Sequence, residues 1–162
     1  MTEHTLFKTT YDREVCDIGV VHIGYGAFHR AHQAVFIDDV MDMTGDLRWG
    51  IASVNLRQSE SRAFGIAAQA GEGYIVNTIA PDGARDFRLV RPHIKFADAT
   101  SAPEQATDLL ALDSVHMVTV TVTESGYYLN EHDQLDLDAP PVAAAESRRS
   151  PHRVSQSHPR PP

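Results

Sequence analysis

The sequence has a single cysteine and no long apolar run, and each shortage excludes a class of protein. One cysteine, Cys16, cannot form an internal disulfide, which fits a reducing compartment and predicts a cytoplasmic protein. Charges and histidines break every apolar run before it reaches the roughly 18 residues that a membrane span needs. The N-terminus, Met1 to His4, has no basic segment leading into an apolar one, so we expect neither a membrane protein nor a signal peptide.

Positive charge is also scarce outside the C-terminal end. The formal net charge is −8; residues 139–162 contribute +3, and residues 1–138 contribute −11. An acidic body repels the nucleic-acid backbone, and the basic end has no aromatic residue to stack on bases. We therefore expect no nucleic-acid partner.

What is present is a strand, a tight turn and a helix near the N-terminus. The apolar run Ile18–Ile23 stops at Gly24 and Gly26, and a helical pattern begins at Ala27. In a dinucleotide-binding turn the first glycine makes the sharp turn and the second lets the backbone approach a pyrophosphate at the helix N-terminus. The third glycine of that fingerprint would fall at position 29, which is His29. By pattern alone, a nucleotide site and an ordinary strand-to-helix turn both remain open.

Polar side chains follow this turn. Arg30 could add positive charge near a pyrophosphate, and His29 and His32, three residues apart, share a helix face. A metal site would need a further ligand that the sequence does not place there, so we expect a structural role for both histidines and no metal.

Ten adjacent residues make the signal specific. Gly24-Tyr25-Gly26-Ala27-Phe28-His29-Arg30-Ala31-His32-Gln33 resembles the signature of the long-chain mannitol dehydrogenase family, which includes polyol dehydrogenases and hexuronate reductases. A second block, 119–130, resembles the family's T-x-T-E-x-G-Y segment, and its Gly-Tyr-Tyr-Leu-Asn ending is most similar to the branch that acts on D-arabinitol. Stretches within 49–57 and 73–83 agree, so the resemblance covers about residues 17 to 141.

The resemblance implies an NAD-dependent polyol dehydrogenase that converts D-arabinitol or mannitol to the ketose. It implies that the cofactor turn is shaped by Gly24, Tyr25, Gly26, Ala27, Phe28, His29 and Arg30. The family's base is a lysine in a second domain, and no lysine follows Glu124 here, since the chain has only Lys8 and Lys95. We therefore predict no catalytic residue in this chain. A non-catalytic nucleotide-binding remnant and a hexuronate reductase are the alternatives.

The ends of two further strands supply the remaining candidates. After the strand that ends at Asn55, an acid would favour NAD and an arginine NADP. The sequence offers Asn55 and Arg57 instead of an acid, so NADP stays open and only the resemblance favours NAD. Thr123 and Glu124 end the β-branched run from Val115 and are expected to line the ligand crevice, although Glu124 fits a solvated loop acid equally well. We interpret Asp38 and Asp39 as solvated helix charges.

The order of elements predicts an α/β fold, a Rossmann-type doubly wound sheet with a β-hairpin insertion. The hairpin is formed by residues 74–80 and 87–90 around Pro81-Asp82-Gly83. Residues 1–16 show no period. From Ala139, proline, serine and arginine replace the apolar pattern, and we expect a disordered tail. We thus predict a dinucleotide-binding domain over 1–138 and a tail over 139–162, for which truncation or a frameshift is the economical explanation.

Overall fold

The computed structural model describes residues 6–122 and 124–149. The chain forms two compact units, one ending at Thr121 and one beginning at Val122. The first unit contains both sheets and every element up to β7 (Met117–Val120).

A four-stranded parallel sheet is the centre of the first unit. Its strands are β2 (Ile18–Ile23), β3 (Gly50–Asn55), β6 (His93–Asp98) and β7, in the order β6-β3-β2-β7. In chain order this is 3-2-1-4, the strand order around the switch point of a Rossmann sheet. The predicted fold class is confirmed. Strand β6 was not foreseen from the sequence.

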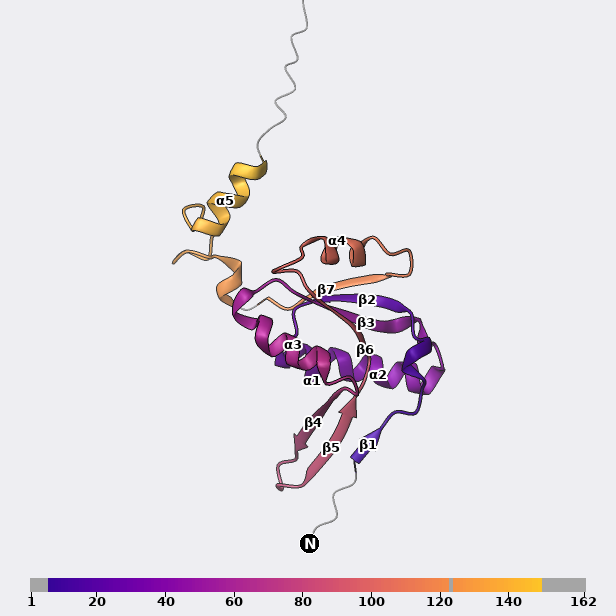
Figure 1. The fold of residues 1–162 in the computed structure, drawn as a ribbon. Helices are drawn as coiled ribbons and strands as arrows, with labels where there is room; N and C mark the ends of the chain where they lie inside the picture. Colours follow the sequence, from indigo (N-terminus) through magenta and orange to yellow (C-terminus); the bar gives the residue numbers. More distant parts are fainter. Residues whose placement is uncertain (1–5, 123, 150–162) are drawn as a thin grey trace, which may run out of the picture. The chain divides into compact units, whose positions relative to one another are not determined.

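Helices cover both faces of this sheet, as buried parallel strands require. Figure 1 shows α1 (Ala27–Ala31), α2 (Gln33–Thr44) and α3 (Ser61–Gln69) on one face and α4 (Glu104–Leu110) on the other. Because side chains alternate along a strand, Val20 packs with Ala34 beneath α2, whereas Val21 packs with Leu109 of α4. Short 3-10 turns complete the connections: η1 (Arg13–Val15), η2 (Leu47–Trp49) and η3 (Gln58–Glu60).

A second, three-stranded sheet lies beside the first unit's helices (Figure 1). The predicted hairpin is present as β4 (Tyr74–Ile79) and β5 (Arg85–Val90), which pair antiparallel. The N-terminal β1 (Leu6–Lys8), in a stretch without sequence period, pairs parallel to β5. The sheet order is therefore β1-β5-β4.

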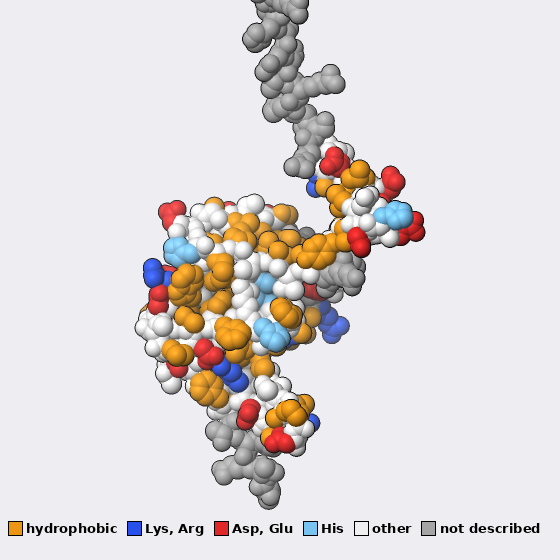
Figure 2. Space-filling view, turned by 180° about the vertical axis from the view of Figure 1, so that it is seen from behind, with side chains coloured by type: hydrophobic (Ala, Val, Ile, Leu, Met, Phe, Trp, Pro, Cys, Tyr) orange, Lys and Arg blue, Asp and Glu red, His pale blue; other side chains and the backbone are white. Residues whose placement is uncertain are grey.

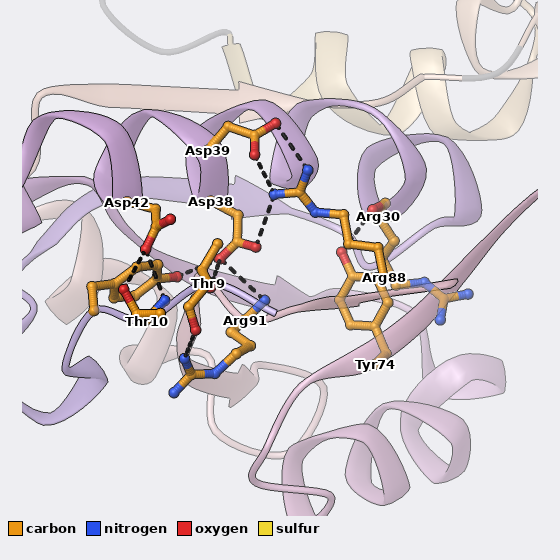
Figure 3. A network of polar contacts seen from close by, with 10 residues as sticks. Thr9, Thr10, Arg30, Asp38, Asp39, Asp42, Tyr74, Arg88 and Arg91 are labelled. Atoms are coloured by element: carbon orange, nitrogen blue, oxygen red, sulfur yellow. Dashed lines mark hydrogen bonds and ion pairs between the residues drawn. The ribbon is translucent and has the colours of Figure 1, made fainter. Parts of the chain in front are cut away.

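A buried carboxylate joins this second sheet to α2, shown in Figure 3. Asp38 is fully buried, and its Oδ1 accepts hydrogen bonds from Thr9 Oγ1 at 3.3 Å and from the backbone N–H of Arg91 at 3.3 Å. Tyr11 OH donates to the same oxygen at 2.5 Å. Arg88 reaches Asp38 Oδ2 at 3.2 Å and holds both carboxylate oxygens of Asp39. The expectation of a solvated helix charge was wrong for Asp38, which lies on the helix face that turns inward with Ala34 and Met41, whereas the side chain of Asp39 is 37% exposed.

The second unit was expected to be disordered from Ala139, and within the described residues it is not. Pro140–Arg149 form helix α5, whose first turn is closed by Ala143 N–H donating to Ala139 O at 3.0 Å. Proline suits a first helical position, and the three alanines that follow Val142 are the best helix formers. Earlier in this unit lie η4 (Glu124–Tyr127) and an isolated bridge between Leu129 and Leu135. Residues 150–162 of the expected tail lie outside the described residues.

Among the described residues, no helix has the length and apolar character needed to cross a membrane. Large apolar side chains are nevertheless exposed, among them Phe36 and Met43 on α2 at 69% and 84%. Figure 2 shows apolar side chains on one face in several separate groups with polar ones between them.

Candidate functional site

The two glycines after β2 have the conformations that the sequence predicts. Gly24 has a φ of +116°, which residues with a side chain rarely adopt, and its N–H donates to Val54 O of β3 at 2.8 Å. Gly26 is the N-cap of α1 and no side chain caps the helix. A Cβ built on Gly26 would meet no atom within 4 Å. The turn thus presents uncapped helix amides and open space at the carboxyl end of β2, where an anion can approach the backbone.

Tyr25, between the glycines, points into an aromatic cluster. Its ring meets those of Phe64, Tyr74, His93 and Phe96 edge-on, with centroids 5.1–6.0 Å apart. Burial raises the pKa of Tyr25, against the opposing effect of Arg30. Tyr25 therefore anchors the turn to the protein and does not extend into the open space above it.

Arg30 stacks on this cluster. Its guanidinium carbon lies 5.0 Å from the centroid of Tyr25 and 5.5 Å from that of Tyr74, within cation–π range. Tyr74 OH donates to Arg30 O at 2.7 Å, as Figure 3 shows. Ala27 and Phe28, in the first turn of α1, are exposed, and Phe28 packs against the ring of His32 at 4.7 Å.

His29 and His32 do not share a face. His32 is exposed and interrupts the helix between α1 and α2 with φ −124° and ψ −80°. His29 is 1% exposed and lies between α1 and the sheet, where it stacks on His22 with centroids 3.5 Å apart and planes 5° from parallel. The burial of His29 is consistent with the structural role expected for it, whereas the expected shared face was wrong because the helix breaks after Ala31.

His29 belongs to a buried polar cluster that the sequence did not reveal. Its Nδ1 lies 2.8 Å from Gln33 Oε1 and its Nε2 lies 2.9 Å from His93 Nε2. His22 Nδ1 lies 2.8 Å from Thr119 Oγ1, which also contacts Gln33 Oε1 at 3.2 Å. Gln33 and Thr119 lie in the two blocks that resemble the family, but neither block indicates that these side chains meet the histidines, and no pattern places His93 beside His29.

Burial sets the charge state of these rings. Desolvation, followed by the charge of His29, lowers the pKa of His22 to about 4. Desolvation likewise lowers the pKa of His29 to about 4, with Arg30 adding to the effect and Gln33 opposing it. Desolvation and the neighbouring His29 lower the pKa of His93 well below its ordinary value. The cluster is therefore uncharged at neutral pH. Within the described part of the chain, no group of three or more histidine, cysteine or acidic side chains is arranged to hold a metal.

At the end of β3, Asn55 is fully engaged in the protein. Its Nδ2 lies within 3.2 Å of Arg57 O, Ser61 Oγ and Asp98 Oδ1, and its Oδ1 accepts from Arg57 N–H at 3.0 Å. The side chain of Arg57 is 65% exposed and pairs with Glu60 at 3.3 Å. The structure therefore leaves the Arg57 side chain accessible at this strand end and holds Asn55 in the loop.

The remaining candidates, Thr123 and Glu124, follow strand β7. Strand β7 ends at Val120, earlier than expected. Thr123 falls outside the described residues, and Glu124 begins η4 in the second unit, with its side chain outside the described part.

Comparison with known proteins found no matching family model but clear relatives. The chain is 32% identical to a mannitol 2-dehydrogenase of Pyrenophora tritici-repentis over 146 residues, which is 90% of this chain and 26% of the relative. It is 32% identical to a D-arabinitol 4-dehydrogenase of Klebsiella pneumoniae over 76% of this chain and 27% of the relative. A D-arabinitol 4-dehydrogenase of Ralstonia nicotianae is 35% identical over 77% of this chain and 27% of the relative. The chain thus spans about a quarter of the length of these curated relatives.

Solved structures agree on the fold. A D-sorbitol dehydrogenase in substrate-free form matches 88% of this chain and 30% of its own, with a TM-score of 0.75 and 27% identity. Mannitol 2-dehydrogenase of Pseudomonas fluorescens, in a ternary complex with NAD and D-mannitol, matches 88% of this chain and 29% of its own, with a TM-score of 0.77 and 24% identity.

Proposed function

The chain belongs to the long-chain mannitol dehydrogenase family, and from that membership we propose that it forms the dinucleotide-binding part of an NAD-dependent polyol dehydrogenase. The observation that carries the proposal is the turn from Gly24 to Gly26. It follows β2, which lies between β3 and β7 where the strand order reverses, and this switch point is where open α/β sheets bind their ligands. We propose residues 1–138 as the dinucleotide-binding domain and, from the single cysteine, a cytoplasmic location.

The residues of the turn fit a pyrophosphate. Gly26 leaves open space where any side chain would stand, and the amides at the start of α1 have no competing cap. These amides would hold the phosphates, and the half-buried ring of Tyr25 would keep the loop in place beneath them. NAD, when bound, supplies the carbon that accepts a hydride.

NAD is the preferred cofactor in this proposal and NADP the alternative. A ternary complex of the similar Pseudomonas fluorescens enzyme contains NAD. Arg57, the residue that would favour an extra phosphate, is already paired with Glu60. We propose a polyol substrate, D-arabinitol or mannitol, because these are the compounds named for the relatives. A hexuronate reductase of the same family is the second enzyme considered.

A non-catalytic nucleotide-binding protein is favoured by one specific observation. The only two lysines, Lys8 in β1 and Lys95 in β6, are exposed and lie within strands, neither of them at the turn after β2. A general base must come within hydrogen-bond reach of the proton that it takes. We therefore propose that this chain binds the dinucleotide and supplies no base.

Calorimetric titration with NAD and with NADP in one buffer tests the binding proposal. Gly26→Val should abolish NAD binding, because its side chain would occupy the open space that the phosphates need. Since a Cβ at Gly26 meets no protein atom, the variant should unfold at the same urea concentration as the parent chain.

Gly65→Val is the matched control, because Gly65 in α3 is also surrounded by open space. It should bind NAD as the parent does. Equal affinity of the Gly26 variant and the parent would show that the phosphates bind elsewhere, and a clear preference for NADP would implicate Arg57.

Activity is the second measurement. The chain alone should give no NADH absorbance with D-arabinitol or mannitol, since alignment of the reacting groups, worth effective molarities of roughly 10⁵ M or more, and the base are both required. Turnover that scales with chain concentration and is lost in Gly26→Val would contradict the proposal that this chain lacks the base.

A further inference from the structure

The third glycine of the dinucleotide fingerprint is replaced by a histidine whose side chain has its own place in the fold. That glycine ordinarily lets the helix pack closely on the strand. Here the imidazole of His29 fills the space between α1 and the sheet, flat against His22 of β2. The nitrogen atoms of a polar ring in this position need hydrogen-bond partners, because an unpaired buried polar group is destabilising.

The hydrogen bonds of the cluster fix the tautomer of each ring. Gln33 Oε1 is an acceptor, so both Thr119 Oγ1–H and His29 Nδ1–H donate to it. Thr119 Oγ1 then accepts from His22 Nδ1–H. With its proton on Nδ1, neutral His29 offers a lone pair at Nε2, and His93 Nε2–H donates to it. One set of protons thus satisfies four contacts that join β2, β7, α2, α1 and β6.

The opposite arrangement is less favourable. Rotating the Gln33 amide would reverse every bond and place protons on His22 Nε2 and His93 Nδ1, two buried atoms that have no partner among the described residues. In the first arrangement these two atoms carry lone pairs. Buried N–H groups without an acceptor are rarer in proteins than buried acceptors without a donor, so the first arrangement is preferred.

The cluster lies directly under the turn. His22 Nε2 is 3.6 Å from the position that a Cβ of Gly24 would take, and the ring of His93 meets that of Tyr25 at 5.1 Å. We propose that His29 is a positioning residue: through the ordered chain of neutral side chains His22, Thr119, Gln33 and His93, it fixes the height and orientation of the glycine turn for the dinucleotide. This inference rests on the function proposed above.

The groups around the histidine cluster keep its rings uncharged. The charged groups that face it are both cationic, Arg30 from α1 and Arg13 from η1, whose guanidinium donates to His93 O at 2.5 Å. Tyr25 and Tyr74 face it with raised pKa values. An added proton would have to go to His22 Nε2 or His93 Nδ1, where no acceptor among the described residues meets it.

Nitrogen-15 spectra of the histidine-labelled full chain test the proton order, with signals assigned through single His→Gln variants. His22 and His29 should carry their proton on Nδ1, His93 on Nε2, and all three should remain neutral at about pH 6, near the ordinary histidine pKa. The reverse pattern, or a charged ring at that pH, would contradict the proposed proton positions in the cluster.

Thr119→Val tests whether the chain positions the turn. The change keeps the shape of the side chain and removes the link between His22 and Gln33, so NAD should bind about 2- to 10-fold more weakly, the equivalent of one hydrogen bond of roughly 0.5–1.5 kcal/mol. Thr78→Val, the same change at an exposed position of β4, should leave the affinity unchanged.

The outcomes separate the two proposals. Unchanged NAD affinity in Thr119→Val, with an altered His22 tautomer, would overturn the positioning role and leave the proposed function intact. No NAD binding by the parent chain would overturn the proposed function and the positioning role together, while the proton order is still decided by the spectra. If Thr119→Val fails to fold, Gln33→Met, which breaks both contacts of the same amide oxygen, replaces it in the titration and should also weaken NAD binding.

Discussion

Helix α2 takes part in two buried polar clusters, an uncharged one at Gln33 and a charged one at Asp38. In the first, three histidines, a threonine and an amide are joined by hydrogen bonds, and no ring is charged. In the second, the carboxylate of Asp38 accepts from three donors at Oδ1 and from Arg88 at Oδ2. The uncharged cluster supports the glycine turn, while the charged one joins the N-terminal segment and the second sheet to the helix.

The comparison teaches how each region tolerates change. A buried charge is held by its partners, so removing it leaves those partners, above all Arg88, without compensation. A neutral network has no charge to expose at pH 7, but it must gain one on acidification. We therefore expect mutation of the charged cluster, and acidification of the neutral cluster, to cause the largest losses of stability.

Asp38→Ala should have the largest effect. Breaking a buried ion pair by removing one partner costs about 3–5 kcal/mol, and here the free energy of unfolding measured in urea should fall by that amount. Asp42→Ala is the matched control: its carboxylate accepts from Thr10 N–H at 2.7 Å at an exposed site and should cost about 1 kcal/mol. Equal losses in the two variants would show that Asp38 does not hold the second sheet to α2.

Acidification should have the next largest effect. The pKa of His22 and of His29 falls from the ordinary histidine value of about 6.5 to about 4 on folding. Below about pH 6.5 the unfolded chain therefore binds more protons than the folded chain. This contribution to stability is therefore complete above about pH 6.5 and is lost as the pH falls toward 4, by on the order of 3 kcal/mol for the two coupled rings together. Urea titrations across this range measure the slope.

Two variants make the acid effect specific. His29→Gln should flatten the slope, because one buried titrating group is gone. His132→Gln, at a side chain that is 73% exposed, should leave the slope unchanged. A slope unaffected by the His29 change would mean that other groups govern acid unfolding.

The sequence reveals the local part of this architecture and misses the part that depends on distant contacts. Strand β2, both turn glycines, the hairpin and the helix end at Gly45 follow from short-range signals, and all are present. Asp38 could not be placed, because α2 turns its apolar Phe36, Val40 and Met43 outward and its charged Asp38 inward. An amphipathic pattern assigns the inward face to apolar residues and here misleads.

The histidine cluster shows the same limit at the site. The turn itself could be predicted because a strand, two glycines and a helix are consecutive. Gln33 is local, but His93 lies 64 residues from His29 and Thr119 lies 86 residues from Gln33, so no local pattern brings the cluster together. Helix α5 was missed for a different reason: its prolines and arginines outweighed the run of alanines in our interpretation.

The smallest effect compares the two kinds of acceptor directly. Tyr11 OH donates to the carboxylate of Asp38 at 2.5 Å, and Tyr74 OH donates to the neutral carbonyl of Arg30 at 2.7 Å. Burial is the first cause that raises the pKa of each phenol. Replacing each tyrosine by phenylalanine removes only the hydroxyl, so the change in unfolding free energy reports the hydrogen bond.

Tyr11→Phe should cost about 1.5–3 kcal/mol and Tyr74→Phe about 0.5–1.5 kcal/mol, because hydrogen bonds to charged groups are roughly twice as strong as neutral ones. Urea unfolding of both variants at pH 7 measures the difference, and the double variant checks that the two losses add, as expected for separate acceptors. A larger loss at Tyr74 would mean that the hydrogen bond to the neutral Arg30 carbonyl stabilises the fold more than the hydrogen bond to the buried charge of Asp38.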